Sequence, residues 1–158
     1  MSLDYPFWVN DFDRVKDHKE KFPLASNIFE HPVSFWYGER NGKEMEKIAY
    51  SLQRLLRRTA PQLPVLVVYN MPNRDIGQYS KGGATSRESY LNFIKEFADG
   101  IGSNRPILVF EPDSLTHATE LGTDEQNDRL TLMKDGLQLL TDNCDALVYI
   151  DIGHSNWL

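Results

Sequence analysis

The sequence predicts an α/β fold in which helices cover a parallel β-sheet. Short apolar runs that suit strands alternate along the chain with longer segments whose apolar residues recur at helical spacing. The run over residues 65–69 is apolar without interruption, which is typical of a strand that is buried on both faces of a parallel sheet. Because no linker, repeat or low-complexity tract interrupts the alternation, we expect a single domain over residues 1–158.

The first half of the chain contains two of the expected strands. An apolar and aromatic stretch over residues 29–37 predicts the first strand, which Gly38 ends. Apolar residues at helical spacing over residues 43–58 predict a helix. Pro61 then separates this helix from the second strand, at residues 65–69.

The second half repeats the same order of elements. After a glycine-rich loop, Thr85 and Glu88 have the spacing of a capping box and predict the start of a helix. Residues 107–110 predict the third strand and residues 146–150 the fourth. The helix between these strands shows a second such pattern, Thr123 and Gln126, and is expected to bury Leu130, Met133, Leu137 and Leu140.

The charge pattern argues against a nucleic-acid partner. The net charge is −6, and the basic cluster Arg54, Arg57 and Arg58 lies at the predicted end of a helix, where positive side chains complement the helix dipole. No run of about 18 apolar residues is present, so no membrane span is expected. The single cysteine, Cys144, excludes an intramolecular disulfide, and we predict no cofactor.

Polar and aromatic residues follow each of the four predicted strands. The carboxyl ends of parallel strands lie on one edge of the sheet, where sites of this fold form. We therefore expect these side chains to gather in one place. In strand order they are Trp36 and Tyr37, then Tyr69, Asn70, Arg74 and Asp75, then Glu111 and Asp113, and finally Asp151, His154 and Trp157.

Aspartates gathered with tryptophans and tyrosines indicate sugar chemistry. Pyranose rings stack their C–H faces on aromatic side chains, and their hydroxyls need carboxylate and amide partners. Cleavage of a glycosidic bond needs one carboxylic acid that is still protonated, and usually a second carboxylate. Neighbouring carboxylates and partial burial both raise the pKa of an acid, so this edge of the sheet could supply the proton donor.

Four segments resemble the motifs of glycoside hydrolase family 6, in the family's order and spacing. The two signatures of the family are matched by residues 67–75 (VVYNMPNRD) and residues 109–115 (VFEPDSL). Residues 6–10 (PFWVN) resemble its opening segment, and residues 149–158 (YIDIGHSNWL) resemble its Asp-x-Gly-His-x-x-Trp stretch. The resemblance implies an inverting β-1,4-glucanase on a distorted, TIM-type parallel β/α barrel.

The resemblance also implies the roles of individual residues. Asp113 would be the general acid, and Asp75 would raise its pKa, steady the developing positive charge and help to hold the attacking water. Arg74 would orient and balance Asp75. The remaining roles would be ring distortion by Tyr69, stacking by Trp36 and Trp157, and shaping of the site next to Asp113 by Asp151 and His154.

Each of these residues also has a simpler interpretation. Asp113 could cap the turn that follows its strand, and Arg74 with Asp75 could be an ordinary surface ion pair. Asp151 and His154 could join a metal site, although their spacing does not require one, and our prediction is no metal. Trp36 could belong to the core, as Trp8 is expected to do, and His31 and His117 receive no role.

The sequence departs from the family pattern at two positions beside Asp75. Ile76 stands where the family usually has a disulfide-bonded cysteine. Lys81 stands where the family often has a serine that holds the catalytic water, and Ser80 is its neighbour. Either Ser80 takes over that task or the chain of waters is rebuilt near a cation.

The length predicts about half of a barrel. The chain has 158 residues, whereas barrels of this kind typically need about 250, so we expect roughly four β/α units and an unpaired edge at residues 146–150. The family's later strands, which carry the aspartate proposed as the base, lie outside the sequence. It is therefore either an excised half-barrel or half of a site that a partner completes, and a homodimer is one hypothesis.

Two functions of different classes follow from these observations. The first is hydrolysis of β-1,4-glucosidic bonds in cellulose or a related β-glucan; the short loop over residues 74–82 favours internal cleavage over a cellobiohydrolase. The second is a catalytically silent half-barrel that at most binds carbohydrate through Trp36, Tyr69 and Trp157. An extracellular location is implied by the resemblance alone, because the start of the sequence shows no secretion signal.

Overall fold

The four strands of the described chain form one parallel sheet. The computed structural model describes residues 6–39 and 46–155. The strands are β1 (Ser34–Tyr37), β2 (Val65–Val68), β3 (Ile107–Phe110) and β4 (Leu147–Ile150), and their spatial order equals their order in the sequence. This arrangement confirms the predicted parallel α/β sheet, and each strand lies within the range that the sequence indicated.

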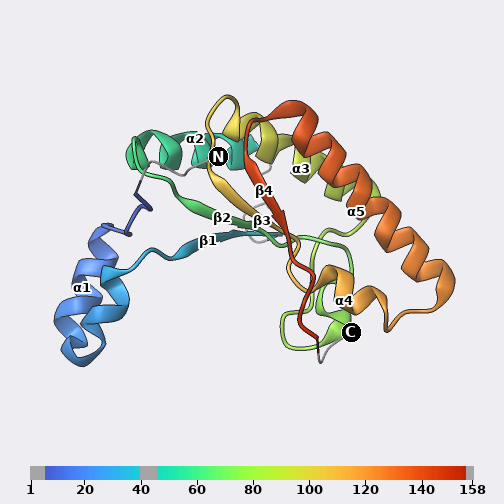
Figure 1. Cartoon of the computed structure of the whole chain (residues 1–158), viewed down its shortest axis with the longest axis horizontal. Coiled ribbons are helices and arrows are strands. Elements are labelled where there is room, and N and C mark those ends of the chain that lie inside the picture. The colour runs from blue at the N-terminus through green and yellow to red at the C-terminus, as the bar shows by residue number, and fades with distance from the viewer. Residues whose placement is uncertain (1–5, 40–45, 156–158) are drawn as a thin grey trace.

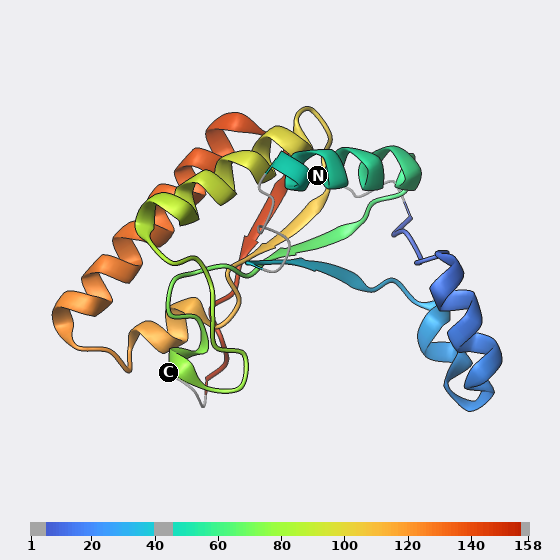
Figure 2. The same ribbon diagram turned by 180° about the vertical axis from the view of Figure 1, so that it is seen from behind.

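Three helices pack side by side against one face of this sheet (Figures 1 and 2). They are α2 (Glu46–Thr59), α3 (Arg87–Ile101) and α5 (Thr123–Asn143), and α3 contacts both of the others. The largest side chains without solvent exposure come from the helices and the two central strands. They include Ile48, Leu52, Leu66, Tyr90, Phe93, Phe97, Leu108, Phe110 and Leu140.

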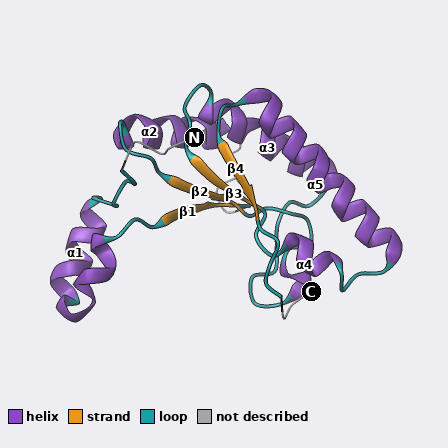
Figure 3. Cartoon of the chain, viewed as in Figure 1, coloured by secondary structure: helices purple, strands orange, loops and turns teal. Residues whose placement is uncertain are grey.

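The shorter elements lie at the two ends of the sheet (Figure 3). Helix α1 (Asp13–Lys21) and the 3-10 helix η1 (Pro23–Glu30) extend away from the sheet ahead of β1, while α4 (Ser114–Ala118) lies beyond the strand ends. Another short 3-10 helix, η3 (Asp75–Gly77), contacts α4 there. The observed strand β1 is shorter than the predicted range of residues 29–37. Residues 23–30 form the 3-10 helix η1 instead, which starts at a proline.

Both predicted capping boxes are wrong in detail. Ser86, not Thr85, is the N-cap of α3, and it forms a reciprocal pair of hydrogen bonds with Ser89 rather than with Glu88. Helix α5 begins after Gly122 and has no side-chain cap. Capping depends on the backbone angles at a single residue, which the spacing of residue types does not determine.

The buried face of α5 also differs from the expectation. Met133 and Leu140 are buried and Leu137 is half-buried, but Leu130 is 39% exposed. The buried face runs instead through Arg129, Leu132, Met133, Gly136 and Leu140. An arginine therefore takes the helical position that faces inward, and it does so at the end of the sheet where the site lies.

The sheet has open edges within the described residues. Strand β4 pairs with β3 alone and exposes Tyr149 and Ile150 by 56% and 42%, so the predicted unpaired edge is confirmed. Trp8 is buried against Phe12 and Phe35, as expected for a core residue. No helix in residues 6–39 or 46–155 is both long and apolar enough to cross a membrane.

Candidate active site

The register of the strands brings their four carboxyl ends to the same level. Tyr37, Val68, Phe110 and Ile150, the last residues of the strands, are neighbouring partners across the sheet. Segments that are far apart in the sequence therefore meet beyond these residues, on the side of α4 (Figures 1 and 2). This geometry explains why the polar residues after each strand gather at one edge.

Asp75 lies in the loop between β2 and α3, at the start of η3. Its Oδ2 accepts a hydrogen bond of 2.6 Å from the backbone N–H of Ser80, and its Oδ1 lies 3.9 Å from Nε2 of His117. The side chains of Asp75 and His117 are only 16% and 5% exposed. His117, which received no role from the sequence, therefore faces the Asp75 carboxyl from α4, and only the fold could reveal this contact.

Asp113 presents its carboxyl to the same space. Its backbone N–H donates a 2.8 Å hydrogen bond to Oδ2 of Asp151, whose other oxygen accepts from the N–H of Gly153. Asp113 occupies the N-cap position of α4, but its side chain makes no capping hydrogen bond. Asp113 thus stands at the start of the helix, but the alternative that its side chain caps the following turn is wrong.

The surroundings of Asp113 favour its protonated form. Burial raises the pKa of this carboxyl, the negative charges of Asp151 and Asp75 raise it further, and His117 opposes them. Asp75 therefore acts electrostatically on Asp113, although the two residues come from different loops. Asp151 thus both holds the backbone of Asp113 and favours retention of its proton.

In the described chain the Arg74 guanidinium binds Glu39 and backbone carbonyls rather than the Asp75 carboxyl, so its predicted role of orienting and balancing Asp75 stays a prediction. Its Nη1 donates to Oε2 of Glu39 at 2.8 Å and to the carbonyl oxygen of Tyr69 at 2.7 Å, while its Nε donates to the carbonyl oxygen of Ser80 at 2.7 Å. Its remaining nitrogen, Nη2, also donates to Glu39. The side chains of the sequence neighbours Arg74 and Asp75 therefore have different partners, Glu39 and the backbone N–H of Ser80.

Aromatic side chains line the opening next to these acids. Trp36 is 55% exposed, so the prediction that it could be core is wrong, and its ring meets that of Tyr69 edge-on with centroids 5.3 Å apart. Both rings border a cavity of about 370 Å³, which Arg74, Ser80 and Lys81 also line. His154 is exposed near the end of the described chain, and Trp157 lies outside the described residues.

Glu111 is a buried residue beside the site, and we predicted no role for it from the sequence. It has no solvent exposure, and its Oε2 accepts hydrogen bonds of 3.0 Å from the backbone N–H groups of both Asn70 and Met71. Burial raises the pKa of its carboxyl to about 7, against the lowering effect of these two N–H groups. Glu111 thus joins the ends of β2 and β3.

Arg129 is the second supporting residue that sequence reasoning missed. Its guanidinium, from the buried face of α5, donates to the carbonyl oxygens of Pro72 and Asn73 at 3.2 and 2.9 Å and to the Ser114 hydroxyl at 3.3 Å. It therefore ties the loop before Asp75 to the helix after Asp113. The sequence could have indicated this residue, because the helical spacing of α5 places Arg129 on the same face as the buried residues Leu132 and Met133.

Glu111 is expected to make the folded chain less stable as the pH rises from about 4.5 to about 7. The pKa is about 7 in the folded state and 4.5 in the reference state, so the folded protein binds more protons in this range and the free energy of unfolding falls with rising pH. The loss from this group is at most about 3 kcal/mol and levels off above the folded pKa.

The variant Glu111→Gln, which resembles the protonated side chain, should lack this component of the pH dependence. Urea unfolding of both proteins at about pH 5 and about pH 8 measures it, with the exposed Glu120→Gln as the control for loss of a charge. An identical pH dependence in wild type and Glu111→Gln would contradict the raised pKa.

Backbone strain is concentrated at the same edge. The non-glycine residues with positive φ angles in the described chain are Asn73, Asp75, Ile76, Glu111 and Asp113, with φ between 45° and 67°. Such conformations are unfavourable for residues with a Cβ and are found most often at functional sites. Their presence in both acid-bearing loops supports the assignment of this edge as the site.

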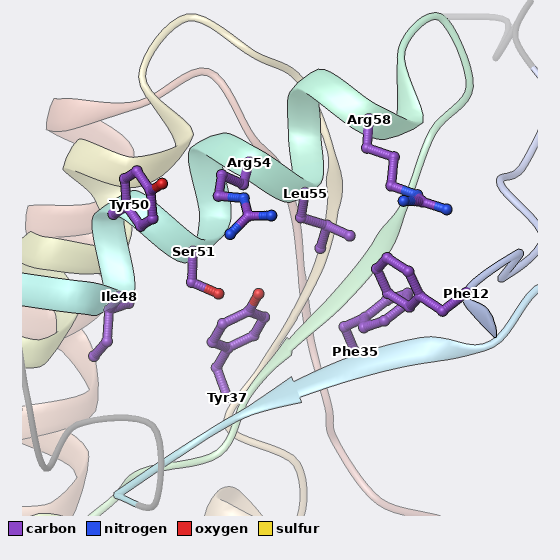
Figure 4. A pocket seen from close by; sticks show the side chains of 9 residues that line it. All are labelled: Phe12, Phe35, Tyr37, Ile48, Tyr50, Ser51, Arg54, Leu55 and Arg58. Atoms are coloured by element: carbon purple, nitrogen blue, oxygen red, sulfur yellow. The ribbon is translucent and has the colours of Figure 1, made fainter. Parts of the chain in front are cut away.

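A larger cavity, of about 540 Å³, lies between α2 and β1 (Figure 4). Its wall is mainly aromatic and aliphatic, and the Tyr37 hydroxyl points into it toward Ser51 and Arg54. Among the residues that the structure describes, none of those lining this cavity carries a carboxyl group. The chemistry of the side chains, rather than the size of the hollow, therefore identifies the site. In residues 6–39 and 46–155, no three His, Cys, Asp or Glu side chains are grouped to hold a metal ion.

The fold and the candidate site together describe a parallel α/β protein with acidic and aromatic side chains at the carboxyl ends of its strands. The chain belongs to a particular family of this class, the glycosyl hydrolases family 6, whose profile matches residues 9–158. Endoglucanase 1 of Streptomyces sp. (strain KSM-9) is 35% identical to it over 144 residues, which are 89% of this chain and 39% of that protein. Endoglucanase A of Cellulomonas fimi is also 35% identical, over 85% of this chain and 29% of that protein.

A solved structure agrees over the whole chain. The endoglucanase Cel6 of Mycobacterium tuberculosis, in complex with methyl-cellobiosyl-4-deoxy-4-thio-β-D-cellobioside, superposes with a TM-score of 0.89 at 28% identity, over 99% of this chain and 55% of that chain. The predicted family is thereby confirmed, as is the predicted fold, part of a distorted TIM-type barrel. The chain spans less than half of the length of the two curated relatives.

Proposed function

We propose that this chain is part of a catalytic domain that hydrolyses β-1,4-glucosidic bonds in cellulose or a related β-glucan with inversion. One observation carries the proposal: the Asp113 carboxyl does not cap its helix and has a raised pKa, with the charges of Asp75 and Asp151 contributing to that rise. Asp113 and Asp75 also act on Tyr69, whose ring meets that of Trp36. Family membership and the two relatives named endoglucanase support the same reaction. In this proposal residues 1–158 form one partial domain.

Asp113 acts in this mechanism as the general acid. Its proton passes to the glycosidic oxygen while the bond between that oxygen and the anomeric carbon breaks, and a water oxygen attacks the anomeric carbon from the opposite face of the ring. The water proton goes to a base, which we do not assign among the described residues. Asp75 stabilises the positive charge that develops on the sugar and helps to hold the water.

In this proposal the other predicted site residues bind the sugar chain and shape the site. Trp36 and Trp157 stack on sugar rings on either side of the cleaved bond, and Tyr69 crowds the ring at that bond and favours its distorted form. Ser80 holds Asp75 through its backbone N–H, and Lys81 lines the same cavity as Trp36. The Asp151 carboxylate positions Asp113 by accepting a hydrogen bond from the Asp113 backbone N–H, and His154 closes the site after the end of β4.

Cleavage should occur inside the glucan chain and outside the cell. The loop over residues 74–82 is short and is closed by a bridge between Arg74 and Gly82, which supports an open cleft rather than the tunnel of a cellobiohydrolase. The extracellular location rests on the resemblance alone. The exposed edge of β4 is compatible with a partner that completes the barrel, including a second copy of this chain.

The proposal predicts that the first product of cellotetraose cleavage carries the α configuration at its new reducing end, because a single displacement inverts the β bond. Proton NMR of the anomeric signals during the reaction measures this, and maltotetraose, with α bonds, is the control substrate. An initial β product would contradict inversion. No product from either sugar, with retained cellotetraose binding, would instead support the alternative of a silent, carbohydrate-binding half-barrel.

A further inference from the structure

The carboxylate of Glu39, directly after β1, receives hydrogen bonds from two segments of the loop that carries Asp75. It accepts from Nη1 and Nη2 of Arg74 at 2.8 and 3.2 Å, and from the backbone N–H of Gly83 at 3.1 Å. Arg74 and Gly83 are the two ends of this loop, which the Arg74–Gly82 bridge closes. One side chain from the turn after β1 therefore holds the base of the loop together, and we call this contact the clamp.

The clamp is packed more closely than an ordinary surface ion pair. The Arg74 side chain is 12% exposed and that of Glu39 is 34% exposed, whereas exposed pairs of this kind contribute little to stability. A Cβ at Gly82 would lie 2.5 Å from Oε1 of Glu39, so a larger residue there would have to displace the carboxylate. Burial alone would raise the pKa of Glu39, but hydrogen bonds from backbone N–H groups, including that of Gly83, and the charge of Arg74 together lower it.

The same guanidinium connects the clamp to the aromatic wall of the site. The Arg74 guanidinium lies over the ring of Tyr69, 4.5 Å from its centroid, and donates to the Tyr69 carbonyl oxygen. The Tyr69 ring in turn meets Trp36. Glu39 thus holds the Arg74 guanidinium, and Arg74 in turn holds the Tyr69 ring that contacts Trp36. Arg74 also binds the carbonyl oxygen of Ser80, whose N–H binds Asp75.

We propose that Glu39 is a positioning residue that holds the Asp75 loop and the Trp36–Tyr69 wall in the arrangement that binds the glucan chain. The inference rests on the proposed function for the identity of the ligand. It assigns a role to a residue that lies outside the two signature segments, at residues 67–75 and 109–115. Loss of its negative charge should free the Arg74 guanidinium and, with it, the Tyr69 ring.

The test compares wild type with Glu39→Gln, which keeps the size of the side chain and removes the charge, and with the control Glu30→Gln, which removes an exposed charge on η1. The first readout is hydrogen exchange of the Arg74 Nε–H, which donates to the Ser80 carbonyl oxygen. We expect this exchange to become about tenfold faster or more in Glu39→Gln and to stay unchanged in Glu30→Gln. Circular dichroism establishes that all three proteins are folded.

The second readout is the affinity for cellotetraose, followed by tryptophan fluorescence. The Kd should rise roughly five- to twentyfold in Glu39→Gln and by less than about twofold in the control. Unchanged binding in folded Glu39→Gln would overturn the proposal, whatever the exchange rate. If wild type fails to bind cellotetraose while Arg74 exchange is still faster in Glu39→Gln than in wild type, the glucan ligand is refuted and the clamp is supported.

Discussion

Asp113→Asn is expected to reduce cleavage of soluble cello-oligosaccharides by about 10²–10⁴-fold, the usual contribution of a positioned general acid. Asparagine has nearly the same shape but no proton of suitable acidity to give to the leaving oxygen. The Asp113 carboxyl makes no capping hydrogen bond and acts on its neighbours through charge. The substitution should therefore leave the fold and the binding of cellotetraose intact while the turnover rate falls.

The matched control for this experiment is Asp145→Asn. Asp145 is exposed and precedes β4, at the opposite end of the sheet from Asp113, so it removes the same charge without touching the site. Release of reducing ends from cello-oligosaccharide measures the rate in wild type and both variants. Equal rates at the background level in all three would contradict turnover by this chain and favour the silent half-barrel.

The features that could be predicted from the sequence are those that depend on chain order. Once residues 65–69 and 107–110 are identified as buried parallel strands, their carboxyl ends must share an edge, and Asp75 and Asp113 follow them along the chain. No knowledge of side-chain contacts is needed for that step. The raised pKa of Asp113 follows in the same way, because acids brought to one partly buried edge repel each other's charge.

The choice of hydrogen-bond partners could not be predicted in this way. Arg74 has an acidic neighbour in the sequence but binds Glu39, 35 positions away, and Glu111 binds backbone N–H groups about 40 positions away. Such contacts depend on the direction in which each loop leaves its strand. Here the direction follows the left-handed backbone conformation of Asp75 and its neighbours, which their residue types do not predict.

Gly83→Ala is expected to destabilise the chain by at least about 3 kcal/mol, which would lower the midpoint of thermal unfolding by roughly 6–12 °C. The glycine has a φ of +92°, and a Cβ there would lie 1.9 Å from the carbonyl oxygen of Met71 and 2.8 Å from its carbonyl carbon. These atoms are backbone at the end of β2, directly beside the N–H of Met71 that Glu111 binds. The clash therefore cannot be relieved by rotation of a side chain.

Gly77→Ala is a matched control because it separates backbone strain from the clash. Gly77 also has a positive φ, of +82°, but a Cβ there would meet nothing within 4 Å, so alanine should cost only about 1–2 kcal/mol for the left-handed conformation. If Gly83→Ala and Gly77→Ala lowered the unfolding midpoint equally, close packing of the loop against β2 would be wrong. A larger loss at Gly83, accompanied by weaker cellotetraose binding, would show that this contact holds the Asp75 loop against the strand ends where Asp113 also lies.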